Sequence, residues 1–208
     1  MVDTSGRFPV ESFELQSVDT AFQKIEELAA ESIGVMMDSG PPIEATAITY
    51  RTDRDAEELR LAMARQQLTN YEMVPEITAT VEFLQAGGEV NGLSVVAVYD
   101  LGSSGLTVSI VDIPTRTVRY AERTEEVSGD LFDALIRDHQ ISTGRIAAPT
   151  SPEGYVALDA RCRQGKEQLS VNPAAALPAD TGLVLLSREV FDRMIAPSEE
   201  ASARMMVV

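Results

Sequence analysis

Near the middle of the chain the sequence reads Val95-Val96-Ala97-Val98-Tyr99-Asp100-Leu101-Gly102-Ser103-Ser104-Gly105. Its apolar part, residues 93–99, is typical of a β-strand that is covered on both faces. The strand ends at Asp100, and a turn of small residues leads into a second strand over residues 106–113. Backbone N–H groups of such a turn can bind an anion, and a carboxylate at the strand end can hold a Mg²⁺ water. The segment therefore predicts either a phosphate-binding turn or a plain hairpin that uses Asp, Gly and Ser for conformational reasons.

Helices and strands alternate on both sides of this hairpin. Upstream, the apolar spacing predicts a helix over residues 18–37, a strand over 45–50, a helix capped by Thr52, a strand over 69–74 and a helix over 77–85. Downstream, residues 117–124 complete a meander of three strands. Helices beginning at Ser128, Glu153 and Ser187 follow, with a strand over residues 183–186 before the last of them. The order predicts an α/β protein.

The 208 residues suffice for one large domain or two small lobes at about 150 residues per domain. Gly87-Gly88 marks a break in the chain, and after Gly92 the alternation of helices and strands gives way to three consecutive strands. Both features favour two lobes. We expect an N-terminal extension (residues 1–16), a first α/β lobe (17–88), a second lobe with the turn and an upper helical subdomain (92–196), and a loose tail (197–208).

Charge and composition exclude several classes of function. With 17 basic and 33 acidic residues, the net charge of -16 repels nucleic-acid backbones and anionic lipid, so we expect neither nucleic acid nor membrane as a partner. The single cysteine, Cys162, excludes an internal disulfide framework and favours a reducing, cytoplasmic location. The single histidine, His139, excludes a metal site built from several histidines of this chain.

The hairpin resembles the second phosphate-binding motif of the actin-like ATPase superfamily, and in particular of the heat-shock-70 chaperones. In that family Asp-Leu-Gly-Gly-Gly-Thr precedes a Val-Ser-Ile strand, and here the sequence is Asp100-Leu101-Gly102-Ser103-Ser104-Gly105 followed by Val108-Ser109-Ile110. Further segments are similar to the family in the same order, across residues 18–195. They are the helix and strand at residues 22–50, Val74-Pro75-Glu76-Ile77-Thr78-Ala79, Ser128-Gly129-Asp130-Leu131-Phe132-Asp133 with His139, and Cys162-Arg163-Gln164-Gly165-Lys166-Glu167-Gln168-Leu169-Ser170.

This resemblance implies a two-lobed fragment of ribonuclease-H-like, actin-like ATPase architecture, with mixed sheets flanked by helices. It implies that Asp100 is a catalytic residue that faces the γ-phosphate of ATP and holds Mg²⁺ through a water. It also implies that Glu76 is a second catalytic residue, which lies across the cleft near a metal-bound water. Backbone N–H groups for the phosphates would come from Gly102, Ser103, Ser104 and Gly105. Lys166 and Ser170 would contact the nucleoside, whereas Asp133 and His139 would be structural.

Several departures from the family weaken the expected chemistry. Gly105 replaces the threonine of the motif, and Ser103 and Ser104 each add a Cβ where the backbone should approach phosphate most closely. Arg163 and Glu167 reverse the family's charge pattern near the adenosine. The match also begins after the family's first phosphate motif and catalytic lysine, and phosphoryl transfer depends on charges from both sides of the phosphates. We therefore expect no ATP hydrolysis from this chain by itself.

Three functions remain open from the sequence. The first is a partial heat-shock-70-like nucleotide-binding domain that binds nucleotide or protein, with ATP or ADP and Mg²⁺ as ligand or with no ligand at all. Bare apolar surface would then favour a protein partner or self-association. The second is a phosphotransferase similar to sugar and acetate kinases, and the third is a ligand-free structural or interaction domain of the same fold. Sugar-dependent phosphotransfer would select the second, and indifference to every ligand the third.

Overall fold

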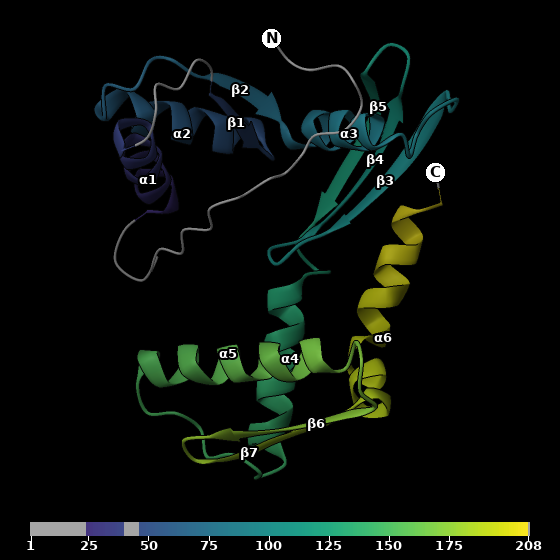
Figure 1. Cartoon of the computed structure of the whole chain (residues 1–208). Helices are drawn as coiled ribbons and strands as arrows, with labels where there is room; N and C mark the ends of the chain where they lie inside the picture. Colours follow the sequence, from purple (N-terminus) through teal and green to yellow (C-terminus); the bar gives the residue numbers. More distant parts are fainter. Residues whose placement is uncertain (1–23, 40–45, 208) are drawn as a thin grey trace. The chain divides into compact units, whose positions relative to one another are not determined.

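The computed structural model describes residues 24–39 and 46–207 and has a mixed α/β fold (Figure 1). These residues form two compact units. The first unit comprises the described residues up to Val96 together with Asp112–Thr117. The second comprises Ala97–Val111 together with the described residues from Val118 onward. The lobe boundary at residues 88–92 stays a prediction of the sequence.

The first unit contains α1 (Ile25–Ser39), β1 (Ala47–Tyr50), α2 (Asp53–Arg65), β2 (Glu72–Pro75) and α3 (Glu76–Gly87). The helix expected at residues 18–37 is confirmed from Ile25 onward, and its first residues lie outside the described part. The cap at Thr52 is also confirmed, because its hydroxyl accepts from the Asp55 N–H at 3.1 Å while the Asp55 carboxylate accepts from the Thr52 N–H at 3.2 Å.

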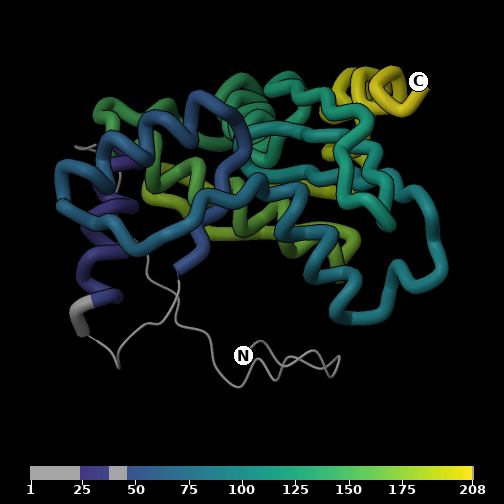
Figure 2. Tube along the Cα trace, turned by 90° about the horizontal axis from the view of Figure 1, so that it is seen from above, coloured from purple at the N-terminus to yellow at the C-terminus, as the bar shows by residue number. Residues whose placement is uncertain are grey.

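Strands β1 and β2 pair in parallel, with Ile48 opposite Met73. Helix α1 packs against α2 with its axis in a different direction, and the two neighbouring helices can be followed in Figures 1 and 2. Ala30, Ala62 and Met63 are fully buried where these helices pack, and they share a hydrophobic core with Ile48. The core of the first unit therefore lies between the helix pair and the small parallel sheet.

The meander expected from the sequence is confirmed as a three-stranded sheet in the order β3-β4-β5. Its strands are β3 (Val95–Leu101), β4 (Leu106–Asp112) and β5 (Thr117–Thr124). The expectation that the first of these strands is covered on both faces is wrong, because alternate residues of β3 are exposed, Val95 by 41% and Tyr99 by 44%. The most buried strand of the sheet is β4, where Leu106, Val108, Ser109 and Val111 are buried and the other residues are half-buried.

The rest of the second unit contains α4 (Gly129–Ser142), α5 (Pro152–Gln168), β6 (Ala174–Ala179), β7 (Gly182–Ser187) and α6 (Arg188–Met205). Strands β6 and β7 form an antiparallel hairpin, and α5 lies over one of its faces (Figure 1). Ile136, Leu158, Cys162 and Val184 are buried in the core between this hairpin and the helices. A second cluster joins Leu106 of β4 to α4 and α6.

Helix α6 continues through a segment that we expected to be a loose tail from residue 197. Pro197 lies inside the helix and removes one helical N–H, yet the helix runs on to Met205. Two contacts explain the continuation. Met205 is buried in the cluster that contains Leu106, and the Ser198 hydroxyl donates to the Glu126 carbonyl at 3.3 Å. Tertiary packing therefore outweighs the local effect of the proline.

Candidate functional site

The phosphate-binding turn predicted at Gly102–Gly105 connects β3 to β4. Its ends are closed by the Gly102 N–H, which donates to the Gly105 carbonyl at 2.9 Å. Two carbonyls of the turn accept from the first turn of α4: the Gly129 N–H donates to Gly102 at 3.0 Å, and the Asp130 N–H donates to Ser103 at 2.9 Å. The structure thus joins two of the segments on which the family resemblance rests.

Gly129 makes this junction sterically feasible. A Cβ at this position would lie 3.3 Å from the Ser103 Cα and 3.4 Å from the Lys166 Nζ. The preceding residue, Ser128, caps α4 as the sequence predicts, with its hydroxyl accepting from the Leu131 N–H at 3.1 Å. The turn is consequently held at a fixed position against the helix N-terminus.

Lys166 links α5 to α4 at the junction between the turn and the α4 N-terminus. Its ammonium lies 2.8 Å from the Asp133 carboxylate and donates to the Gly129 carbonyl, also at 2.8 Å. The two side chains are only 18% and 8% exposed. Burial raises the pKa of the Asp133 carboxyl, and Lys166 opposes that effect by favouring the ionised form. The residue that the resemblance implies as a nucleoside contact therefore holds two helices together in this structure.

A hollow of about 330 Å³ opens beside this junction. Two cations, Arg163 and Lys166, and three acids line it together with Gly102 and Ser103; the acids are Asp130, Asp133 and Glu167. Arg163 and Glu167, whose charges are reversed from the family pattern, form an exposed ion pair at 2.9 Å on consecutive turns of α5. Much of the charge around the hollow is therefore balanced within the protein.

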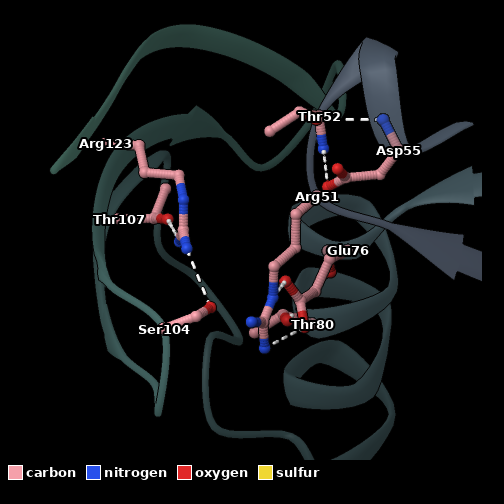
Figure 3. Close-up of polar contacts among 8 residues, drawn as sticks. All are labelled: Arg51, Thr52, Asp55, Glu76, Thr80, Ser104, Thr107 and Arg123. Carbon is pink, nitrogen blue, oxygen red and sulfur yellow. Dashed lines mark hydrogen bonds and ion pairs between the residues drawn. The ribbon is translucent and has the colours of Figure 1, made fainter. Parts of the chain in front are cut away.

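On β5, Arg123 lies against the turn from another direction (Figure 3). Its guanidinium donates to the Ser104 hydroxyl at 3.0 Å and to the Thr107 hydroxyl at 3.2 Å. No ion pair joins Arg123 to an acidic residue in the described part of the chain. The sequence alone does not single out Arg123, because only the pairing of β5 beside β4 brings this residue to the turn. The one hint in the sequence is that Gly105 stands where the motif it resembles has threonine.

Two predicted catalytic residues lie in different units. Glu76 begins α3 in the first unit, where its carboxylate accepts from the Arg51 guanidinium at 2.6 and 3.3 Å (Figure 3). Asp100 lies near the end of β3 in the second unit and is half-buried. Among residues 24–39 and 46–207, no side chain forms an ion pair or hydrogen bond with the Asp100 carboxylate. Ser170, the second predicted nucleoside contact, is exposed just after α5.

The donor set at the turn does not suit Mg²⁺. Magnesium prefers carboxylate and other oxygen ligands, whereas the group held against the turn is the cationic guanidinium of Arg123. In the part of the chain that the structure describes, no three His, Cys, Asp or Glu side chains are grouped so that they could hold a metal ion.

Cys162 and His139 show no sign of a catalytic role. Burial, with a smaller contribution from Asp159, raises the pKa of the Cys162 thiol to about 12, so the thiol is protonated at neutral pH. His139 lies in the last turn of α4, and its carbonyl accepts from the Thr143 hydroxyl at 2.7 Å.

No protein-family model matches this chain, and no curated protein matches it significantly. Over residues 24–39 and 46–207, every helix is too short or too polar to span a lipid bilayer.

Proposed function

We propose that this chain is a partial, degenerate nucleotide-binding domain of the heat-shock-70 type, with actin-like architecture. In this proposal it binds ATP or ADP as a binding module and does not hydrolyse ATP. The observation that supports it most strongly is the junction of the Gly102–Gly105 turn with the N-terminus of α4 and with Lys166. Three separate segments of the resemblance meet there within hydrogen-bonding distance.

The absence of hydrolysis follows from how the predicted catalytic groups are used. Glu76 is engaged in a two-point ion pair with Arg51, which lowers its capacity to orient a water or a metal ligand. On its β5 side the turn is faced by the Arg123 guanidinium, which repels Mg²⁺. Phosphoryl transfer depends on metal ions and positioned charges around the phosphates, and this arrangement supplies too few of them. The single buried cysteine suits a module that works in the cytoplasm.

Thermal unfolding and a phosphate-release assay test the two halves of the proposal. A nucleotide at about 100 times its Kd should raise the unfolding midpoint by about 5–10 °C at this chain length, and adenosine should not reproduce the rise. Phosphate release should stay at background for the wild type. Asp100→Asn is compared with Asp192→Asn, a change at an exposed position of α6. Turnover that Asp100→Asn abolishes and Asp192→Asn preserves would contradict the proposal.

A second candidate is an interaction domain that keeps the fold without a small ligand. The charges lining the hollow are largely balanced internally, through Arg163 with Glu167 and Lys166 with Asp133. The outer face of the β6–β7 hairpin also exposes Leu183 by 41% and Leu185 by 39%. A chain that no nucleotide stabilises, and that forms dimers or binds a protein partner, would favour this second function.

A further inference from the structure

We infer that the turn binds phosphate groups directly, without Mg²⁺, through the guanidinium of Arg123 and the neighbouring hydroxyls. This inference rests on the proposed function and specifies its site. The ligand class is the phosphate chain of a nucleotide in its metal-free form. Arg123 is the residue that we assign to the site beyond those taken from the resemblance.

The hydrogen-bond pattern makes the cluster a set of donors. A guanidinium has five N–H groups and no acceptor, and its bonds to Ser104 and Thr107 occupy only part of that capacity. The Thr107 hydroxyl accepts from the guanidinium and keeps its own hydrogen for donation. Donors gathered in this way match the acceptor-only oxygens of a phosphate, and arginine matches phosphate geometry particularly well.

Within residues 24–39 and 46–207, no acidic side chain neutralises the charge of Arg123. The chain contains 33 acidic residues, and arginines such as Arg51, Arg137 and Arg163 pair with them. Arg123 instead contacts two neutral hydroxyls, and no carboxylate of the described residues lies within ion-pair distance of it. A cation placed this way attracts an anion and repels Mg²⁺, so the metal is disfavoured at the point where phosphate is attracted.

Two hydrogen bonds hold the guanidinium at the turn, in the space beside Gly105. A Cβ on Gly105 would lie 2.7 Å from the Arg123 Nη2 and 2.9 Å from its Cζ, so the arginine occupies space that a side chain would otherwise fill. The family's threonine is incompatible with this position of Arg123. A preorganised cation loses little conformational freedom when it binds a ligand, which favours affinity.

Calorimetric titration tests the inference with ATP, tripolyphosphate and adenosine, each in excess EDTA and in millimolar Mg²⁺. The variants are Arg123→Gln, Arg123→Lys and the matched control Arg119→Gln, which removes the same charge from an exposed position of β5. We expect the wild type to bind ATP and tripolyphosphate in EDTA at least as tightly as in Mg²⁺. Arg123→Gln should weaken ATP binding about 10- to 100-fold, since a charged hydrogen-bond donor is lost, and Arg119→Gln should leave it within about twofold.

The outcomes separate the inference from the proposed function. ATP binding that requires Mg²⁺, or that Arg123→Gln leaves intact, overturns the inference and preserves the proposed function. Failure of every probe to bind overturns both. Should Arg123→Gln fail to fold, Arg123→Lys decides, because lysine keeps the positive charge but lacks the planar set of N–H donors of a guanidinium. An ATP affinity between those of the wild type and a non-binding variant supports the inference, and wild-type affinity contradicts it.

Discussion

Gly105 and Arg123 occupy complementary space at the turn between β3 and β4. The position that a Cβ of residue 105 would take lies 2.7 Å from the Arg123 Nη2 and 2.7 Å from the backbone carbonyl oxygen of Thr124. A side chain at residue 105 and the Arg123 guanidinium therefore compete for the same space. This relationship explains a departure that the sequence shows but does not account for.

A side chain introduced at residue 105 should destabilise the protein. We expect Gly105→Thr, and to a lesser degree Gly105→Ala, to lower the free energy of unfolding by about 1–3 kcal/mol, because the new atoms overpack the turn. Denaturation in urea measures the change. Gly165→Ala is the control, since a Cβ there meets Leu177 and Val184 at an ordinary 3.7 Å.

Removing the arginine should relieve only part of that strain. In the double variant Gly105→Ala with Arg123→Ala, the Thr124 carbonyl still lies too close to the new methyl group. A Gly105→Thr variant as stable as the wild type would contradict this view of the turn.

Breaking the ion pair between Lys166 and Asp133 should be costly. Lys166→Met leaves the Asp133 carboxylate buried and unpaired, and we expect a loss of about 2–4 kcal/mol at neutral pH, discounted for the partial exposure of Lys166. Asp133→Asn in the Lys166→Met background should recover part of the loss, because the uncompensated charge disappears. A double-mutant cycle that shows no coupling would contradict the assigned role of the pair.

The raised pKa of Asp133 also predicts that the free energy of unfolding depends on pH. Burial raises this pKa above the ordinary value of 3.8, so the folded state holds the proton more tightly than the unfolded state. The stability of the wild type relative to Asp133→Asn should be greatest below the ordinary pKa. It should fall as the pH rises through the raised pKa and stay constant above it. Urea denaturation across that range measures the difference, and an increase with pH would contradict the direction of the shift.

The Gln140 side chain forms hydrogen bonds with the backbone of β7 at Leu185. Its fully buried amide donates to the Leu185 carbonyl at 2.9 Å and accepts from the Leu185 N–H at 3.2 Å. Gln140→Leu should therefore cost about 1–3 kcal/mol, mainly because the Leu185 N–H loses its partner while Arg145 still donates to the carbonyl. Gln164→Leu, at an exposed position of α5, is the control. Equal stability of the two variants would show that the Gln140 bonds contribute nothing.

Cys162 should be unreactive in the folded protein. With a pKa of about 12, only about one thiol in ten thousand is ionised at pH 8, and the side chain is fully buried. A disulfide reagent should modify it only as fast as the second unit opens, and urea should accelerate the reaction. Immediate modification of the folded protein would contradict the burial of α5 against the β6–β7 hairpin.

The sequence predicts best what short-range interactions determine. The caps at Thr52, Ser128 and Ser187 are confirmed, because a cap depends on residues within three positions of it. The predicted helices and the meander are confirmed for the same reason. At the candidate site, the turn itself could be read from its glycines and serines.

Long-range pairing explains what the sequence did not predict. Strand β6 reads Ala-Ala-Ala-Leu-Pro-Ala, which has little intrinsic strand preference, and it forms because it pairs with β7. Helix α6 passes Pro197 because Met205 packs in a distant cluster. Arg123 reaches the turn only across the sheet, and the pairing of Lys166 with Asp133 requires α4 and α5 to pack together.

Backbone amide chemical shifts can locate the proposed nucleotide site residue by residue. ATP is titrated into the isotopically labelled protein in EDTA, with adenosine as the control ligand. We expect that ATP, and not adenosine, shifts the amides of Ser103, Ser104 and Gly105 together with the side-chain Nε–H of Arg123. Shifts confined to other segments, such as the β6–β7 hairpin, or no shifts at all, would contradict it.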